Sequence, residues 1–288
     1  MVRRSVLFSP GDQKKLLRKA PESGADVVVF DLEDAVAPGK KGEARNSVTT
    51  VLDEIDPDCE VCVRINPLDS GGKEDLSALF AVAPAIDSLM LPKVSEPAAV
   101  DELAERIAAA GYELPVLALL ETAGGVLDAR AIAEAKAVDA VLFGAEDLSA
   151  DIGATRTRGG AEISYARQKI VLAASNAGID AIDTLVTDFE ATKQLKADTK
   201  RAVQFGFDGK MAIHPAQIPI INGGFTPDPS EIDWARRVLD ARDEAMAEDR
   251  GVFTVDGEMI DAPLITQAER IVERAKAAGE FDETEGSF

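Results

Sequence analysis

Short apolar, β-rich runs alternate with longer amphipathic stretches through this 288-residue sequence as far as about residue 225. We expect strands at 5–9, 27–31, 61–65, 88–91, 115–121, 138–144, 180–184 and 210–214. Helical patterns such as DQKKLLRKA and SYARQKIVLAASNAG lie between these runs. Strands that alternate with helices in this way form βαβ units, and successive βαβ units give a parallel sheet.

Eight such units can close into a (β/α)8 or TIM barrel, a fold that commonly has about this length. An open, doubly wound sheet is the alternative. The sequence has neither the G-x-G-x-x-G turn nor the Walker A lysine that such sheets often use to bind phosphates. We therefore predict an α/β protein with a (β/α)8 catalytic domain over residues 1–224.

The alternation of strand and helix patterns does not continue in residues 225–288. The segment FTPDPSEIDWARRVLDARDEAMAEDRGVF predicts a linker and a charged helix, VDGEMIDAPLI a short hairpin-like loop, and TQAERIVERAKAAGEF a last helix. A segment of this size buries little apolar surface by itself. We expect it to form a C-terminal helical extension that packs on the barrel or on a neighbouring subunit.

The charge balance is strongly acidic, with 52 acidic against 31 basic residues and a formal net charge of −21. Binding to nucleic acid needs a positive surface, so we expect no nucleic-acid partner. The acidic residues are spread over many helices rather than gathered in one tail. This distribution favours a surface adapted to high salt, as in a halophile, because salt screens the repulsion between like charges. An ordinary acidic cytosolic protein is the alternative.

Membrane and redox roles have little support in the sequence. No apolar run approaches the roughly 18 residues that a membrane-spanning helix needs, and the apolar stretch in MVRRSVLFSPGD is too short for a signal peptide. We expect a cytoplasmic protein with no membrane partner. Cys59 and Cys62 have CxxC spacing, but there is no second pair for zinc, so we interpret both as structural.

Polar residues follow nearly every predicted strand. In a parallel barrel the catalytic groups lie at the C-terminal ends of the strands, where the loops converge. The residues in these places are Asp31, Glu33, Asp34, Arg64, Asn66, Lys93, Glu121, Glu146, Asp147, Asp183 and His214. We predict that they contribute to one shared site.

Glu121 and Asp147 are the candidate metal ligands. The runs ALLE and VLFGAED both end in carboxylates on strands that are adjacent in the barrel. Two such oxygen ligands suit a hard divalent cation, with Mg²⁺ favoured and Mn²⁺ also possible, that keeps other positions for water and substrate. Each acid alone could instead cap the helix that follows it.

Three basic residues at the predicted site have alternative roles. Arg64 can bind an anionic substrate through two parallel hydrogen bonds, or it can form an ion pair with Asp31 or Glu33 that stabilises the barrel mouth. Lys93 could form a Schiff base, but among so many acids a paired and charged lysine is favoured. We interpret His214 as a hydrogen-bonded structural residue.

Seven motifs occur in order along nearly the whole chain: RSVLFSPG, VVFDLEDAV, VRIN, LPKV, ALLETAGGV, FGAEDLSADIG and GKMAIHPAQI. In these motifs the sequence resembles the citrate lyase β-subunit-like group of the HpcH/HpaI aldolase family, which includes malyl-CoA, β-methylmalyl-CoA and citramalyl-CoA lyases. The resemblance implies a magnesium-dependent TIM barrel of the phosphoenolpyruvate/pyruvate type. It also implies Claisen-type cleavage or formation of 3-hydroxyacyl-CoA thioesters.

The resemblance assigns roles to individual residues. Glu121 and Asp147 match the magnesium ligands, and Arg64 matches the arginine that binds the oxo-acid. Phe8 and Lys19 match contacts with coenzyme A, and the segment at Glu146 and Asp147 matches a substrate-binding segment. Asp261 matches an acid that a neighbouring subunit's C-terminal lid delivers in the lyases. We interpret Asp31, Glu33 and Asp34 as the shell that holds Arg64 and metal-bound waters, with Glu33 the member that touches the chemistry.

The substrate follows from the same comparison. The segment ETAGG has no arginine shortly after Glu121, as in the malyl-CoA lyases, which favours malyl-CoA or β-methylmalyl-CoA and release of glyoxylate. Citramalyl-CoA, which gives pyruvate, is the next candidate. The third is a citrate lyase β subunit that acts only with partner subunits and an acyl-carrier protein. A free-standing lyase is expected to be a homotrimer or hexamer that shares its C-terminal lids.

Overall fold

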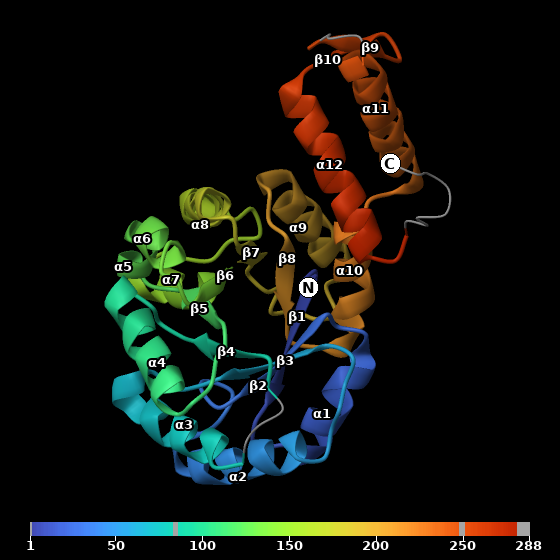
Figure 1. Ribbon diagram of the computed structural model, residues 1–288. Helices are drawn as coiled ribbons and strands as arrows, with labels where there is room; N and C mark the ends of the chain where they lie inside the picture. The colour runs from blue at the N-terminus through green and yellow to red at the C-terminus, as the bar shows by residue number, and fades with distance from the viewer. Residues whose placement is uncertain (1, 83–85, 248–250, 281–288) are drawn as a thin grey trace. The chain divides into compact units, whose positions relative to one another are not determined.

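The eight predicted strands all form, and they close into one parallel barrel in their order along the chain (Figure 1). The computed structural model describes residues 2–82, 86–247 and 251–280. The chain divides into one compact unit at Arg3–Asn222, which holds the barrel, and a second that begins at Gly223. The barrel strands are β1 (Ser5–Pro10), β2 (Val27–Asp31), β3 (Glu60–Arg64), β4 (Ser88–Leu91), β5 (Val116–Leu120), β6 (Val138–Phe143), β7 (Asp180–Asp183) and β8 (Gly209–Ala212).

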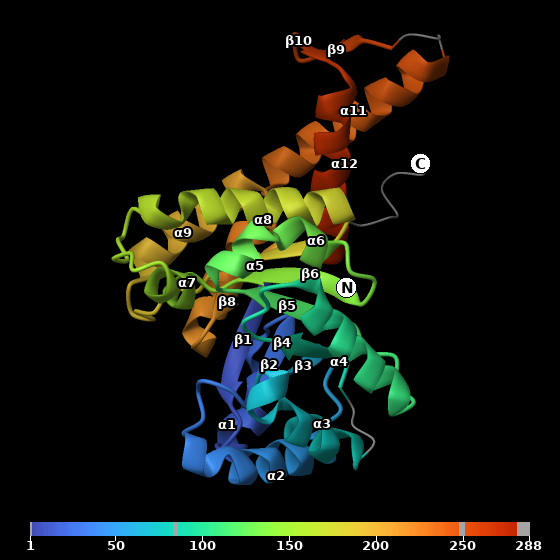
Figure 2. The same cartoon turned by 90° about the vertical axis from the view of Figure 1, so that its left-hand side faces the viewer.

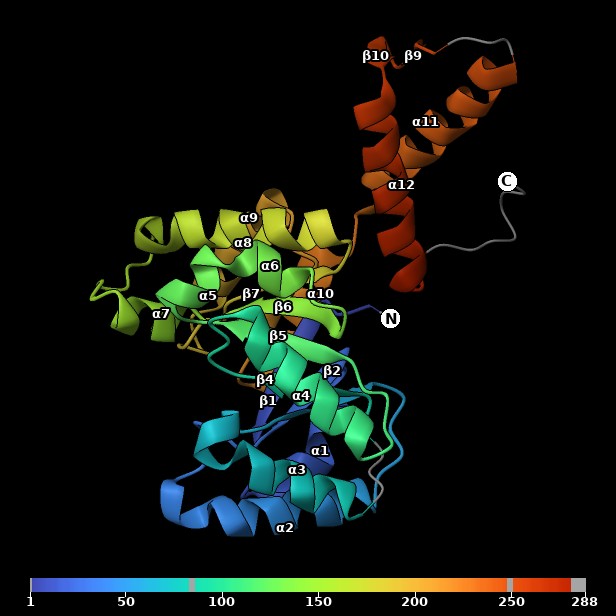
Figure 3. The same cartoon turned by 60° about the vertical axis from the view of Figure 1, so that its left-hand side comes forward.

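Helices follow the strands and cover the outside of the barrel (Figure 2). On this outer layer α6 and α8 lie side by side, and α2 packs beside α3 (Figure 3). The helices up to residue 205 are α1 (Lys14–Lys19), α2 (Lys41–Leu52), α3 (Lys73–Phe80), α4 (Pro97–Ala109), α5 (Ala123–Leu127), α6 (Ala129–Ala133), α7 (Ala145–Asp151), α8 (Ser164–Ala177) and α9 (Thr192–Phe205). The next helix, α10 (Ile218–Phe225), runs across the division between the two units.

Local sequence explains where several helices begin and end. Pro97 stands at the start of α4, where its missing N–H leaves no helical hydrogen bond unmade. Gly178 ends α8 with φ of 72°, in the left-handed region that glycine adopts without steric cost. In the described part of the chain, no helix is long and apolar enough to cross a membrane.

The interior of the barrel is filled by alternate side chains of the strands. Because successive strand residues point to opposite faces, every second residue enters this core. The buried members are Val6, Val27, Val29, Cys62, Met90, Leu117, Leu119, Ala140, Leu142, Ile182 and Met211. Cys62 is thus a packing residue, and both cysteines are free thiols, as expected for structural cysteines.

Arg3 ties together the N-terminal ends of the strands. Its guanidinium donates to Glu60 Oε2 at 2.7 Å, to Asp139 Oδ2 at 2.6 Å and to Asp180 Oδ2 at 3.0 Å. Glu60 also accepts a hydrogen bond from the hydroxyl of Ser88 at 2.6 Å. These contacts join residues of β3, β4, β6 and β7, so the barrel end opposite the candidate site is held by charge pairs.

The second unit consists of two long helices and a hairpin. Helix α11 (Pro229–Ala247) packs along α12 (Ala262–Ala277), and the antiparallel strands β9 (Phe253–Val255) and β10 (Glu258–Ile260) lie between them in the chain (Figure 1). Asp256 and Gly257 form the two-residue turn of the hairpin, both with positive φ, as such turns require. Apolar side chains of both helices and both strands share one small core.

Candidate active site

Arg64 and Asp31 form a bidentate ion pair at the C-terminal end of the barrel. They are register partners on β3 and β2, and each lies two residues beyond an interior side chain, so both point inward. Arg64 Nε and Nη2 donate to Asp31 Oδ1 and Oδ2 at 2.7 and 2.5 Å. The Arg64 guanidinium carbon also lies 5.0 Å from the ring centre of Phe8. The ion-pair alternative for Arg64 is confirmed, and the N–H groups that Asp31 does not bind either face Glu33 or remain for an anionic substrate.

Glu33 lies buried between two cations. Its Oε1 accepts a hydrogen bond from Lys93 Nζ, and its Oε2 lies 3.3 Å from Arg64 Nη1 and accepts the Asp34 N–H at 2.8 Å. Burial raises the pKa of Glu33 above its ordinary value, and the charges of Arg64 and Lys93 oppose that rise. Burial lowers the pKa of Lys93, but the hydrogen bond and charge of Glu33 raise it overall. Lys93 is thus paired, as expected.

Glu121 is a buried acid on this side of the barrel that forms no ion pair within 4.0 Å in the described part of the chain. Its side chain is 2% exposed, and Oε1 accepts the backbone N–H of Lys93 at 2.9 Å. Burial, and next the charge of Asp147, raise the pKa of Glu121 to about 8. A carboxyl group in this state gains stability when a proton or a cation neutralises it.

Charge balance separates the acids of the site into two groups. Asp31 and Glu33 are matched by Arg64 and Lys93. Within residues 2–82, 86–247 and 251–280, no lysine or arginine forms an ion pair with Glu121 or with Asp147, which stands in the first turn of α7. The unmatched charge therefore belongs to the two carboxylates that the sequence identifies as candidate metal ligands.

The donor set fits a hard divalent cation. Glu121 and Asp147 offer carboxylate oxygens only, and Mg²⁺ commonly takes one or two protein carboxylates and completes its shell with water and substrate. The described residues contain no group of three or more His, Cys, Asp or Glu side chains that could hold a metal, which excludes a closed, all-protein cage among them. Two carboxylates that form no ion pair in the described part of the chain fit an open site of this kind.

A cavity of about 150 Å³ is shared by Asp31, Arg64, Glu121 and Asp147. Its lining comes from the ends of β1, β2, β3, β5, β6, β7 and β8. The lining residues are Phe8, Asp31, Ala35, Arg64, Leu119, Glu121, Gly144, Ala145, Glu146, Asp147, Thr184, Leu185, Met211 and Ile213. Thr184, Gly144 and Ile213 were not among the predicted site residues. Each lies two positions beyond an interior strand residue, and this spacing is the signal that identifies them.

The prediction that Asp183 belongs to the shared site is wrong. Ile182 points into the barrel, so Asp183 points outward, where it is fully buried. Arg167 Nη2 donates to Asp183 Oδ2 at 2.6 Å, and Lys210 Nζ donates to the same oxygen at 2.7 Å. Asp183 is thus part of an ion-pair cluster between the barrel and its outer helices.

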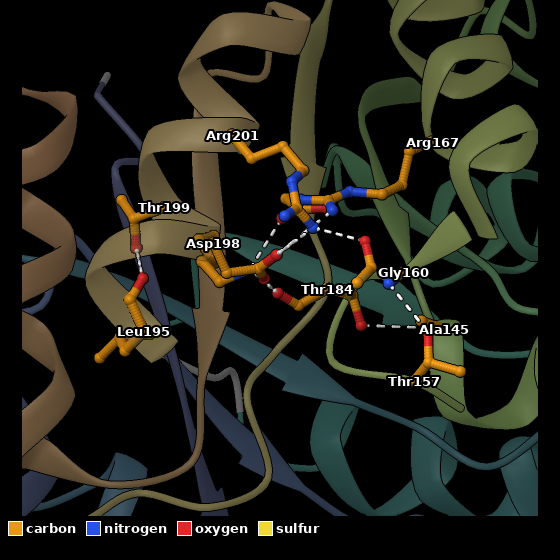
Figure 4. Close-up of polar contacts among 12 residues, drawn as sticks. Ala145, Thr157, Gly160, Arg167, Thr184, Leu195, Asp198, Thr199 and Arg201 are labelled. Atoms are coloured by element: carbon orange, nitrogen blue, oxygen red, sulfur yellow. Dashed lines mark hydrogen bonds and ion pairs between the residues drawn. The ribbon is translucent and has the colours of Figure 1, made fainter. Parts of the chain in front are cut away.

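Figure 4 shows the surroundings of this cluster. Arg167 and Arg201 both approach Asp198, at 3.3 and 3.8 Å. On the other side of the strand, Thr184 faces the site, and its Oγ1 accepts the N–H of Ala145 at 3.2 Å, just before Glu146 and Asp147. Thr184, just beyond β7, therefore stabilises the start of α7, which carries Asp147, while the outward charges remain outside the cavity.

Two other polar residues at strand ends are also structural. Asn66 donates from Nδ2 to Asp75 Oδ2 at 2.7 Å and to the Leu32 carbonyl at 2.9 Å, so it anchors two loops and does not line the cavity. His214 accepts the Ala216 N–H at Nδ1 and stacks on Phe189, with the ring centres 4.5 Å apart. The interpretation of His214 as a hydrogen-bonded structural residue is confirmed.

The remaining candidate residues lie at different places. Glu146 is half-exposed at the cavity and accepts a hydrogen bond from Arg156 Nε at 2.9 Å. Lys19 is exposed at the last position of α1, which follows β1. Asp261 is exposed in the second unit, immediately before α12, and its side chain caps no helical N–H.

Known proteins are similar to this chain along most of its length. The family model described as HpcH/HpaI aldolase/citrate lyase matches residues 4–215. The mitochondrial citramalyl-CoA lyase of Rattus norvegicus is 39% identical, over 96% of this chain and 87% of that protein. The citrate lyase subunit beta of Leuconostoc mesenteroides is 37% identical, over 100% and 97%. A crystal structure of CitE from Mycobacterium tuberculosis with magnesium, acetoacetate and coenzyme A has a TM-score of 0.81, with 37% identity over 96% of this chain and 98% of that one. The chain therefore belongs to the HpcH/HpaI aldolase/citrate lyase family.

Proposed function

We propose that this protein is a Mg²⁺-dependent acyl-CoA lyase that cleaves or forms a 3-hydroxyacyl-CoA. L-Malyl-CoA or β-methylmalyl-CoA is the first candidate substrate, with glyoxylate and acetyl-CoA or propionyl-CoA as products. The observation that carries the proposal is the pair Glu121 and Asp147, two carboxylates at the cavity beside Arg64 that form no ion pair among the described residues. The named ligands of the related CitE structure, magnesium and coenzyme A, support the same assignment.

Each residue has a proposed task in the cleavage. Glu121 and Asp147 hold the metal, which when bound polarises the oxygens of the oxo-acid half of the substrate. Arg64 binds the substrate's oxo-acid carboxylate through its outer N–H groups. As the C–C bond breaks, the hydroxyl gives its proton to water, the bond electrons pass to the thioester as an enolate, and Asp261 protonates the enolate carbon. In the forming direction Asp261 takes that proton.

The other candidate residues bind the substrate at its two ends. Phe8 lies in β1 and Lys19 is the last residue of α1. We propose that both contact coenzyme A and that the lysine binds a phosphate. The first turn of α7, at Glu146 and Asp147, is the proposed substrate-binding segment. We propose that Glu33, the acid that both Arg64 and Lys93 contact, takes part in the chemistry. We also propose a homotrimer or hexamer in which the segment 225–288 of one subunit closes the site of another and brings Asp261 to it.

Citramalyl-CoA is the second candidate substrate. A citramalyl-CoA lyase is 39% identical over 96% of the chain, and a (3S)-malyl-CoA thioesterase of Cereibacter sphaeroides is 36% identical over 96%. The third candidate function is a citrate lyase β subunit, which the relative from Leuconostoc mesenteroides supports. The three candidates differ in the product released and in the need for partners.

The purified chain with Mg²⁺ and a panel of malyl-, β-methylmalyl- and citramalyl-CoA tests these candidates. Coupled assays score glyoxylate against pyruvate, and light scattering gives the oligomeric state. Glyoxylate release by the protein alone supports the first candidate, and pyruvate release supports the second. Inactivity with all three esters, and activity only after addition of carrier-protein partners, contradicts a free-standing lyase.

A further inference from the structure

Lys93 has a backbone conformation that residues other than glycine rarely adopt. It follows β4 with φ of 54°, in the left-handed region, and Asp256 in the hairpin turn is the only other described residue besides glycine with positive φ. Such strain persists where the surroundings hold it in place, and it is common at functional sites. At Lys93 this conformation directs the backbone N–H to Glu121 Oε1 at 2.9 Å.

The side chain of Lys93 contacts a second carboxylate, that of Glu33. Its Nζ binds Glu33 Oε1 and lies 3.6 Å from Asp34 Oδ2. The other oxygen of Glu33 is held by the Asp34 N–H and lies near Arg64 Nη1. One residue therefore contacts both a proposed metal ligand, through its backbone, and the buried acid beside Arg64, through its ammonium.

We propose that Lys93 is a positioning residue that organises the site through Glu121 and Glu33. Its left-handed backbone holds Glu121 in the orientation that binds the metal. Its ammonium holds Glu33 beside Arg64 and keeps that carboxylate from turning towards Glu121. This inference rests on the proposed function for the metal at Glu121 and for the turnover by which the role through Glu33 is measured.

Direct binding of substrate by the ammonium is the competing role. The Lys93 side chain is 38% exposed and lines a neighbouring cavity of about 500 Å³ with Pro67, Ser95 and Glu96. A substrate-binding lysine acts whether or not Glu33 is charged. A lysine that positions Glu33 loses its effect once the Glu33 carboxylate is gone, so a double-mutant cycle separates the two roles.

The cycle compares Lys93→Met, Glu33→Gln and the double variant by kcat and KM with the CoA thioester that the wild type cleaves. We expect each single change to lower kcat by about 10- to 100-fold, the range for groups that support the ligands of a metal site. In the Glu33→Gln background we expect Lys93→Met to lower kcat by no more than a further factor of about two. A loss in the double variant that equals the product of the two single losses overturns the role through Glu33.

The backbone role is tested without turnover, by calorimetric titration with Mg²⁺. Lys93→Gly and Lys93→Val both remove the ammonium and keep the N–H, but only glycine adopts positive φ easily, and valine resists it. We expect Lys93→Val to bind Mg²⁺ at least about tenfold more weakly than Lys93→Gly, as for losses of contacts around a metal ligand. Equal affinity of these two variants overturns the backbone role.

The matched control is Lys73→Met. Lys73 is another half-exposed lysine of the barrel unit, 3.5 Å from Glu102 on the surface. We expect it to leave Mg²⁺ affinity and kcat within about twofold of wild type, since exposed ion pairs contribute little. A protein that binds Mg²⁺ but cleaves no CoA thioester contradicts the proposed function. The Mg²⁺ affinities of Lys93→Val and Lys93→Gly can still be compared in that case, so the backbone role is tested separately.

Discussion

Gly144 lies directly against the side chain of Glu121. A Cβ atom at position 144 would stand 2.6 Å from both Cβ and Oε2 of Glu121, closer than such atoms approach in proteins. Both residues are at inward positions at the ends of the neighbouring strands β5 and β6. The glycine therefore makes room for a carboxylate that the proposed function assigns to the metal.

We predict that Gly144→Ala weakens Mg²⁺ binding by about 10- to 100-fold, as for other changes next to a metal ligand. The added methyl group displaces the Glu121 carboxylate, since neither strand can move freely. Calorimetric titration measures the affinity. Gly42→Ala in α2, where a Cβ meets nothing within 4 Å, is the control and should bind Mg²⁺ as the wild type does. Unchanged affinity in Gly144→Ala contradicts the assignment of Glu121.

Glu121 should make the metal-free protein less stable as the pH rises. Its pKa rises from 4.5 to about 8 in the folded chain, so the folded chain keeps a proton that the unfolded chain releases. The free energy of unfolding contributed by this group is therefore largest below about pH 4.5 and is lost as the pH rises towards about 8. Glutamine does not ionise, so the free energy of unfolding of Glu121→Gln should not fall in this way.

Urea unfolding with a chelator at pH 5 and pH 8 measures the difference. We expect Glu121→Gln to be more stable than the wild type at pH 8 by a few kcal/mol, because each unit by which burial raises the pKa of Glu121 corresponds to ~1.4 kcal/mol. At pH 5 the two proteins should differ less. Added Mg²⁺ should stabilise only the wild type at pH 8. A constant difference across this pH range contradicts the raised pKa.

Asp183 is predicted to matter for stability. Asp183→Ala leaves Arg167 and Lys210 buried with Asp198 as their remaining acidic partner. Breaking a buried ion pair on one side costs ~3–5 kcal/mol of unfolding free energy. In the control, Glu134→Ala removes one side of an exposed pair with Arg130, and we expect a loss below ~1 kcal/mol. Similar losses in the two variants contradict the structural role of the cluster.

The acidic surface predicts a dependence on salt. With a net charge of −21, repulsion between like charges should lower the melting temperature at low ionic strength. The screening length falls from about 10 Å at 0.1 M salt to about 3 Å at 1 M. We expect the melting temperature to rise steadily with KCl over this range. A flat profile contradicts adaptation to high salt and favours an ordinary acidic protein.

The sequence predicts the fold well because its signals are local. Each strand is a short apolar run, and each is followed by a helical pattern, so all eight strands could be placed. The site is predicted less completely. Asp31, Arg64 and Glu121 follow interior residues at a spacing of two and do face the cavity. Asp183 breaks that spacing, and the error came from treating every polar strand end alike.

Other features depend on contacts between distant parts of the chain. Arg3 pairs with Glu60, 57 residues away, and no pattern near either residue indicates that contact. Gly144 is visible in VLFGAED, but its importance depends on the Glu121 side chain of the neighbouring strand. The left-handed backbone of Lys93 is likewise set by its surroundings, since lysine has no preference for positive φ.

Calorimetric titration of Mg²⁺ into the wild type and into Asp147→Asn tests the central claim most directly. We propose that Glu121 and Asp147 bind the metal together, because neither carboxylate forms an ion pair with a lysine or arginine among the described residues. We predict one Mg²⁺ per chain in the wild type and an affinity at least about 100-fold weaker in Asp147→Asn, as expected when a ligand itself is lost. Equal Mg²⁺ affinity in the two proteins would contradict it.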